Sequence, residues 1–189
     1  SGTEAGGHCG EISTMVVVPD VIDAIQDHPD VHVLAAGGIA TGRQMAAVMA
    51  MGAAGAWTGS VWLTSVEAEP IPTVKAKMLN ASAPDTVRSR SRTGKPTRQL
   101  KSPWTAAWSA PGMPEPLEMP LQGMISRPAL AKVDKLAESG HAGAKELATY
   151  YVGQAVGLMK HELRARDVVY EFKKDFAEAV ERLSATMQE

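Results

Sequence analysis

At 189 residues with 44% apolar side chains, the chain is long enough to bury a core, and its composition excludes a disordered segment. Lys and Arg number 19 against 21 for Asp and Glu, a formal net charge of −2 that favours neither nucleic acid nor a membrane surface as a partner. The single cysteine, Cys9, excludes an internal disulfide and a zinc-type Cys/His cluster, and it fits a reducing, cytoplasmic location; no run reaches the roughly 18 apolar residues of a membrane span.

The first 13 residues, SGTEAGGHCGEIS, contain four glycines, which predicts a loop whose backbone can approach a ligand. His8 lies in the middle of this loop, and an imidazole beside a ligand can donate or accept a proton near neutral pH. We therefore take His8 as the strongest catalytic candidate, against the alternative of a solvated or structurally bonded ring. Cys9 is expected to point away from it. Because the chain opens on Ser1 as if leaving an element, we expect the C-terminal part of a longer protein.

Two helices are expected next. The first has Pro19 near its first turn, and its apolar face at helical spacing is formed by Val18, Val21, Ile22 and Ile25. The second begins at Thr41, where Thr41 and Gln44 fit a capping box, and it ends at Gly52 in the usual glycine position.

Residues 31–64 predict a strand, a glycine loop, the second helix, a strand and a second glycine loop. Gly37-Gly38 form the first loop and Gly59-Ser60 the second. Glycines after a strand let backbone amides approach an anion, and a helix N-terminus adds partial positive charge. This predicts an α/β fold with parallel strands whose loops bind one phosphate, against the alternative of turn geometry alone. Neither GxxxxGK[ST] nor GxGxxG after a strand is present, which disfavours ATP, GTP and a Rossmann dinucleotide.

The remaining chain divides by composition. Residues 1–84 carry the glycine loops, residues 85–128 are expected to be an irregular basic and proline-rich connection, and residues 129–189 are expected to be helical. Within the last segment, helices are predicted over 142–160 and over 167–185.

Two further groups of side chains have competing interpretations. A basic run could contact an anionic substrate tail or be a solvated loop face; it comprises Arg88, Arg90, Arg92, Lys95, Arg98 and Lys101. Aromatic side chains could wall an apolar substrate pocket or belong to the core; they are Tyr150, Tyr151, Trp104 and Trp108.

With these residues considered, the sequence resembles the nitronate monooxygenases, once called 2-nitropropane dioxygenases, and their relatives the FMN-dependent enoyl-ACP reductases. The resemblance is carried by four motifs in order: Gly2-Thr3-Glu4-Ala5-Gly6-Gly7-His8, Ala35-Ala36-Gly37-Gly38-Ile39-Ala40, Gly59-Ser60 before Val61-Trp62-Leu63, and Gly153-Gln154-Ala155-Val156-Gly157-Leu158. Three of the four lie in the first third of the chain.

The resemblance implies the C-terminal part of a TIM-type (β/α)8 barrel, about strands 7 and 8, with a helical C-terminal segment that closes over a non-covalent FMN. His8 would lie beside the flavin, as a base toward neutral nitroalkanes and a hydrogen-bond donor toward nitronates. The implied FMN contacts are Gly6, Gly7, Gly37, Gly38, Trp57, Thr58, Gly59 and Ser60, with the phosphate on the amides of Gly37, Gly38, Gly59 and Ser60. No metal ligand is expected. Many members have Gln where this chain has Ser1, so a flavin contact is lost or supplied differently.

By this resemblance the function is oxidation of a nitronate with O₂ to a carbonyl compound and nitrite. The implied partners are the nitronate, O₂ and the missing N-terminal half of the same protein; a homodimer is left open, and neither nucleic acid nor a membrane is expected. One alternative is an FMN-dependent reductase or dehydrogenase of acyl thioesters, enoyl-ACP reductase-like, whose phosphopantetheine-type anion could use the basic run. A third is a non-catalytic binding or structural module that keeps the barrel half without a cofactor.

Overall fold

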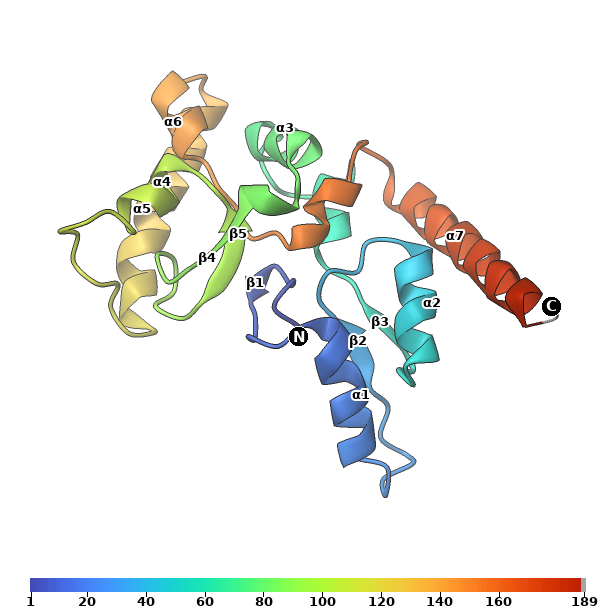
Figure 1. The fold of residues 1–189 in the computed structure, drawn as a ribbon. Helices are drawn as coiled ribbons and strands as arrows, with labels where there is room; N and C mark the ends of the chain where they lie inside the picture. The colour runs from blue at the N-terminus through green and yellow to red at the C-terminus, as the bar shows by residue number, and fades with distance from the viewer. Residues whose placement is uncertain (188–189) are drawn as a thin grey trace.

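A computed structural model describes residues 1–187 as an α/β chain with two small sheets (Figure 1). Its helices are α1 Thr14–Ala24, α2 Gly42–Ala50, α3 Pro72–Asn80, α4 Pro103–Ala107, α5 Leu121–Glu138, α6 Ala142–Leu147 and α7 Ala165–Thr186. Its strands are β1 Gly7–His8, β2 Leu34–Ala36, β3 Gly55–Trp57, β4 Thr86–Ser89 and β5 Thr97–Leu100. Short 3-10 helices lie at Ser60–Thr64, Ala83–Asp85 and Gln154–Leu158.

Strands β2 and β3 are parallel, with α2 as the crossover between them, as the sequence predicts. Leu34 lies opposite Gly55 and Ala36 opposite Trp57, so the two strands end side by side and their glycine loops leave from the same edge. Small buried side chains allow α1 and α2 to lie close on this pair. The cluster that joins them is Val18, Ala35, Ile39, Val48 and Ala53.

The start of α2 is tied to the first glycine loop. The Thr41 hydroxyl accepts a hydrogen bond from the Gln44 amide, which confirms half of the predicted capping box. The Gln44 side chain does not return to the Thr41 amide; its Nε2 donates to the Gly38 carbonyl at 2.7 Å and its Oε1 accepts from the Ala40 amide at 2.9 Å. The cap therefore holds the loop as well as the helix. Gly52 ends the helix with φ 101°, as predicted.

Helix α1 begins earlier than the sequence indicates, at Thr14, and Pro19 lies inside it. The reason is a tertiary cap: the Glu4 carboxylate accepts hydrogen bonds from the Thr14 amide at 3.0 Å and from the Thr14 hydroxyl at 3.0 Å. A carboxylate satisfies the free amides of a helix start. Because Glu4 comes from the preceding loop, no local pattern predicts this start.

The expectation of an irregular connection over residues 85–128 is wrong for residues 86–107 and 121–128; between α4 and α5 the chain forms neither helix nor strand. Strands β4 and β5 form a hairpin, and β1 pairs with β5 to make a three-stranded antiparallel sheet, β1-β5-β4. The glycine-rich N-terminus is accordingly not a loop throughout. Helix α5 also runs across residue 128. The division of the chain at residues 84 and 128 stays a prediction.

Several residues of the basic run are used inside the fold and do not face solvent. The Arg98 side chain is buried, and it donates from Nε to the Thr3 carbonyl at 2.9 Å and from Nη1 to the Thr86 hydroxyl at 3.1 Å. Burial lowers the pKa of the Arg98 guanidinium below its ordinary value. A buried, hydrogen-bonded guanidinium holds strands together rather than facing solvent.

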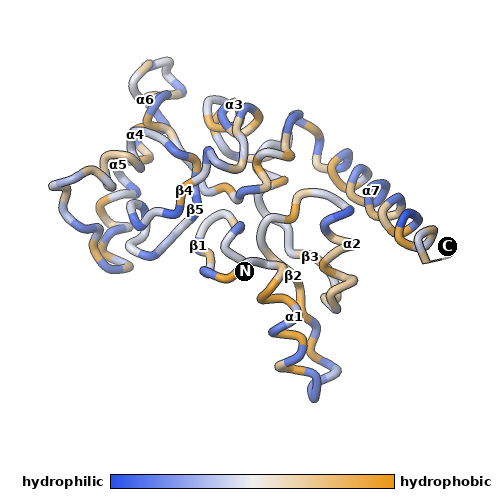
Figure 2. Tube along the Cα trace, in the orientation of Figure 1, coloured by the Kyte–Doolittle hydropathy of each residue, from blue (hydrophilic) through white to orange (hydrophobic). Residues whose placement is uncertain are grey.

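The helix expected over 142–160 is also wrong. Helix α6 ends at Leu147, an extended stretch follows in which Tyr151 bridges to Gln99, and a 3-10 helix covers Gln154–Leu158. Helix α7 confirms the prediction for 167–185 and extends it at both ends; residues 188 and 189 of the expected helical segment lie outside the described residues. Apolar and charged residues alternate along α7 (Figure 2).

Helix α7 lies along α2 (Figure 1). The two helices approach closely at Gly42, where a Cβ would collide with the main chain of Phe172 and Phe176. At the edge of this contact Arg43 forms an ion pair with Asp175, with Nη2 and Oδ1 2.7 Å apart.

Residues 1–187 are α/β, as predicted, and contain one parallel strand pair and no closed barrel; the resemblance implies only about strands 7 and 8 of a (β/α)8 barrel. None of the helices in that range combines the length and the apolar character that crossing a bilayer requires.

Candidate functional site

A cavity of about 420 Å³ opens at the edge where β2 and β3 end. The residues that line it come from the N-terminal loop, both glycine loops and the segment before the last 3-10 helix. They are Ser1, Ala5, Gly6, Gly7, Ala36, Gly37, Gly38, Ile39, Trp57, Gly59, Ser60, Leu63, Tyr150, Tyr151 and Ala155. We call this space the glycine cavity.

Free backbone donors border the glycine cavity. Within residues 1–187, the amides of Gly37, Gly38, Gly59 and Ser60 donate no hydrogen bond to a protein acceptor. Gly37, Gly38 and Ser60 are partly buried, where backbone amides are almost always bonded, so three such free amides beside one cavity are unusual; Gly59 is exposed. Successive free amides form a concave site that attracts anions.

The conformation of the first loop requires glycine. Gly37 and Gly38 have φ values of 122° and 70°, which L side chains rarely adopt. A Cβ at Gly37 would lie 2.8 Å from the Thr14 hydroxyl, and one at Gly38 would lie 3.0 Å from the Glu4 Cβ. Gly59 is different, since its φ of −123° is ordinary and a Cβ there would meet no atom within 4 Å. Gly59 is therefore not required by packing, although it lines the cavity.

The fourth sequence motif joins the other three here. The Gly153 amide donates to the Ser60 hydroxyl at 2.8 Å, and the Gln154 amide donates to the Glu4 carbonyl at 2.9 Å. A Cβ on Gly6 would lie 2.7 Å from the Gly153 nitrogen, so the two backbones meet without room for a side chain. Motifs that are far apart in the sequence thus form one wall.

The N-terminus of α2 does not serve the anion site as expected, because it is bonded to a carboxylate of α7. The α2 N-terminus was expected to add positive charge to the anion site, but the Arg43 amide donates to the Asp175 carboxylate at 2.7 Å. Burial raises the pKa of Asp175, but hydrogen bonds from Arg43 lower it more, and the net pKa lies below its ordinary value. The negative charge at this helix start is therefore supplied by α7.

Most of the residues predicted to contact a cofactor line the glycine cavity. Gly6, Gly7, Gly37, Gly38, Trp57, Gly59 and Ser60 do so. Thr58 does not; its hydroxyl accepts a hydrogen bond from the Trp62 indole nitrogen at 3.0 Å. Trp57 is 69% exposed, so its ring lies at the open rim.

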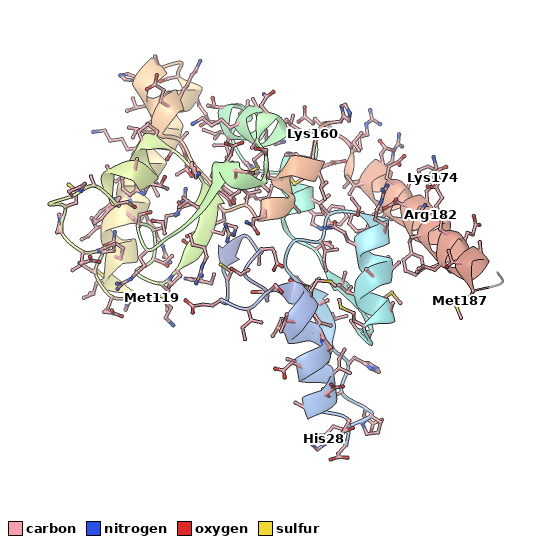
Figure 3. All side chains as sticks on the ribbon, in the orientation of Figure 1. His28, Met119, Lys160, Lys174, Arg182 and Met187 are labelled. Atoms are coloured by element: carbon pink, nitrogen blue, oxygen red, sulfur yellow. The ribbon has the colours of Figure 1, made fainter. Side chains whose placement is uncertain are left out.

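His8 lines a second cavity, of about 520 Å³, next to the glycine cavity along β1. The other residues of this His8 cavity are Thr93 from the hairpin turn and a mainly apolar group at the start of α5: Met119, Pro120, Gly123, Met124, Arg127 and Pro128. Figure 3 places Met119 on the side of the molecule that carries α5. Gly7 lines the glycine cavity and the adjacent His8 lines the second one, so the two cavities meet at β1.

The His8 ring is bonded to the hairpin turn. Its Nε2 lies 2.9 Å from the Thr93 hydroxyl. Sequence reasoning missed both Thr93 and the α5 residues of this cavity, because they lie in the segment expected to be irregular. The sequence of β5, Thr97-Arg98-Gln99-Leu100, does not alternate between apolar and polar residues, so it did not predict a strand. All four residues are nevertheless buried.

Two tyrosines of the glycine cavity lie beside one arginine of the basic run. Tyr150 and Tyr151 line the glycine cavity, and the Arg92 guanidinium lies over both rings, 5.7 and 4.7 Å from their centroids. Trp104 and Trp108 contact each other and line neither cavity. Arg92 also donates to the Thr149 carbonyl, so this residue of the basic run has a structural role.

Comparison with known proteins agrees with this arrangement. A family model described as nitronate monooxygenase matches residues 1–175. The chain is 53% identical to the Mycobacterium tuberculosis protein Rv1533 over 188 residues, which cover 99% of this chain and 49% of that protein. It is 40% identical over 101 residues to an indene carboxyl-CoA dehydrogenase of Rhodococcus jostii, covering 53% of this chain and 28% of the dehydrogenase.

Among solved structures, nitroalkane oxidase from Streptomyces ansochromogenes superposes with a TM-score of 0.77 at 28% identity, covering 97% of this chain and 52% of the oxidase. The chain thus spans about half the length of Rv1533 and of the oxidase. A family model that matches nearly the whole chain, together with four family motifs brought to one cavity, establishes that this chain belongs to the nitronate monooxygenase family of oxidoreductases.

Proposed function

We propose that this chain forms the phosphate-binding and catalytic part of an FMN-dependent nitronate monooxygenase, which oxidises an alkyl nitronate with O₂ to a carbonyl compound and nitrite. The observation that carries the proposal is the group of free amides of Gly37, Gly38, Gly59 and Ser60 beside the glycine cavity. Main-chain donors at the ends of parallel strands are the usual phosphate site of β/α barrels.

The residues present fit FMN in chemistry and in space. Four unbonded amides supply donors for a phosphate without a charged side chain, and the open space at Gly59 admits an anion close to the backbone. Tyr150, Tyr151 and the rim residue Trp57 supply flat apolar surfaces beside the same cavity. When bound, the flavin supplies the redox chemistry, taking electrons from the substrate and passing them to O₂.

The protein's own part in the reaction is to bind, orient and handle a proton. We assign His8 as the base toward neutral nitroalkanes and as a hydrogen-bond donor toward nitronates. The His8 cavity is the proposed substrate pocket, because its apolar wall of Met119, Pro120 and Met124 suits an alkyl chain and methionines adapt to different shapes. Histidine has the proton affinity for both roles near neutral pH.

The activity is proposed for a complete barrel, to which this chain contributes the β2–α2–β3 unit. A further segment equivalent to the other half of the relatives would supply the remaining strands. An apolar surface on α1 and beside it is available for that packing; its exposed residues include Ile12, Met15, Val16 and Val21. A homodimer stays an alternative use of this surface.

A second candidate is an FMN-dependent dehydrogenase or reductase of acyl thioesters. The similarity to a carboxyl-CoA dehydrogenase favours it, since that match covers about half of this chain. Such a substrate carries an extended anionic tail. Lys95 and Lys101, the exposed cations of the basic run, are the side chains left to contact it.

Anaerobic stopped-flow measurement of flavin reduction in the full-length protein separates the two candidates. We expect reduction by an alkyl nitronate within the turnover time and no reduction by NADH. Reduction by NADH with no response to nitronates would reject the monooxygenase and support the thioester enzyme. Purified protein that holds no flavin after incubation with FMN would reject both.

A further inference from the structure

The hydrogen-bond partners around the His8 ring indicate which of its two nitrogens carries the proton. The Thr93 hydroxyl lies 2.9 Å from His8 Nε2, and it also lies 3.2 Å from both the carbonyl oxygen and the amide nitrogen of Lys95. Thr93 is 9% exposed, so water has little access to its hydroxyl, whereas His8 as a residue is exposed.

A proton count favours one arrangement of these groups. A threonine hydroxyl has one proton to donate and two lone pairs that accept. The Lys95 carbonyl can only accept, so the Thr93 proton is assigned to it, and the Lys95 amide donates to one lone pair. The second lone pair then accepts from Nε2–H of His8. In this arrangement every group has a partner, and a neutral imidazole with a proton on Nε2 carries its free lone pair on Nδ1.

The turn that carries Thr93 is held more firmly than most hairpin turns. Ser91 and Arg92 precede Thr93 in the turn between β4 and β5, and all three are buried. Gln122 of α5, fully buried, donates from Nε2 to the Ser91 carbonyl at 2.8 Å, and the buried Ser126 hydroxyl donates to the Arg92 carbonyl. Turns are usually solvated and mobile. Here two side chains of α5 fix the backbone on either side of Arg92.

We infer that Thr93 is a positioning residue that holds His8 with its proton on Nε2, so that Nδ1 is the nitrogen that accepts the substrate proton. Within residues 1–187, Nδ1 of His8 makes no hydrogen bond, which leaves it available. The inference rests on the proposed role of His8 as a base, but the position of the proton can be measured without turnover. Helix α5, through Gln122 and Ser126, then determines the orientation of a catalytic ring that lies far from it in the sequence.

The first test is nitrogen NMR of the full-length protein labelled with ¹⁵N-histidine, with the His8 signals assigned by their loss in His8→Gln. We expect wild-type protein to show a protonated Nε2 whose proton exchanges slowly with water, and an unprotonated Nδ1. Thr93→Ser keeps the hydroxyl and should keep that signal. Thr93→Val has a similar shape without the hydroxyl, so the slowly exchanging Nε2 proton should be lost. A proton on Nδ1 in the wild-type protein would overturn the inference.

The second test is kinetic and compares a neutral nitroalkane, which needs a base, with its preformed nitronate, which does not. Because one oriented hydrogen bond is lost, Thr93→Val should lower kcat/KM for the nitroalkane by about tenfold more than for the nitronate. Thr93→Ser should restore it. Equal losses on both substrates would reject positioning of a base. If the wild-type protein oxidises neither substrate but keeps the Nε2 signal, the proposed function fails while the placement of the proton stands.

Discussion

Polar groups are used differently in two regions of the molecule. These are the region of the glycine loops, residues 1–64, and the hairpin region, residues 86–138. The first leaves main-chain amides free beside a cavity and has a small buried core of short side chains. The second buries polar side chains and bonds them to the backbone; these include Ser91, Thr97, Gln99, Gln122 and Ser126. A free amide is a binding group, whereas a buried bonded side chain fixes a position. Under the proposed function, the first region would hold the ligand and the second would orient the histidine beside it.

The largest expected effect tests the packing of the glycine-loop region. Gly6→Ala would place a Cβ 2.7 Å from the Gly153 nitrogen and 2.8 Å from the Val152 carbonyl carbon, both main-chain atoms that cannot rotate away. We expect a loss of about 3 kcal/mol of unfolding free energy, measured by denaturant titration. Gly7→Ala is the control, because a Cβ there has free space and only a φ of 72° opposes it, a cost of about 1 kcal/mol. Equal losses would show that close approach at Gly6 is unimportant.

The next effect belongs to the hairpin region. Gln122→Met preserves the approximate volume but removes the donor to the Ser91 carbonyl and the acceptor of the Leu117 amide. Because buried backbone groups are left without partners, we expect a loss of about 2 kcal/mol and a weaker Nε2–H signal from His8. Lys132→Met, on an exposed part of the same helix, should change the unfolding free energy little. Unchanged stability in Gln122→Met would contradict the role given to buried polar groups.

A smaller effect separates binding from stability in the glycine-loop region. At Gly59 an added Cβ would meet no atom within 4 Å, so we expect Gly59→Val to unfold close to the wild type. Its side chain would occupy space beside the free amides and should weaken FMN binding about tenfold, measured by flavin fluorescence during titration. Gly59→Ala should weaken binding less. If Gly59→Val binds FMN with full affinity, the phosphate does not bind at this loop.

The smallest effect concerns the attachment of α7 to α2. The pKa of Asp175 lies below its ordinary value, because hydrogen bonds from Arg43 outweigh the effect of burial. The pair therefore stabilises the fold above the ordinary carboxyl pKa of about 4, and this contribution is lost as the pH falls through the lowered value. Asp175→Asn should cost less than about 1 kcal/mol at neutral pH, since Arg43 is largely exposed. The melting temperature of Asp175→Asn should lie below that of the wild type at neutral pH and approach it in acid. Glu181→Gln, on an exposed part of α7, should melt like the wild type at both pH values.

The comparison also explains which predictions succeeded. The parallel strands, the Thr41 cap and the Gly52 stop are local features, and each is confirmed because a few neighbouring residues determine it. The turn conformation of Gly37 and Gly38 is likewise local, because positive φ is a property of single residues, whereas phosphate binding by the two loops stays a prediction. In the hairpin region the prediction failed, since β5 is fully buried yet mostly polar, and its sequence resembles a solvated loop when read alone.

By itself, the sequence determined the glycine loops, the two parallel strands and the four family motifs, all of which depend on short-range conformational preferences. Only the tertiary structure decided that β1 joins the hairpin sheet, that Glu4 starts α1, and that Thr93 meets the His8 ring. The residues of each of these contacts lie far apart in the chain or in different elements, and no periodicity links them. Contacts of this kind depend on how whole elements pack, which is why His8 was found in the sequence and the residue that orients it was not.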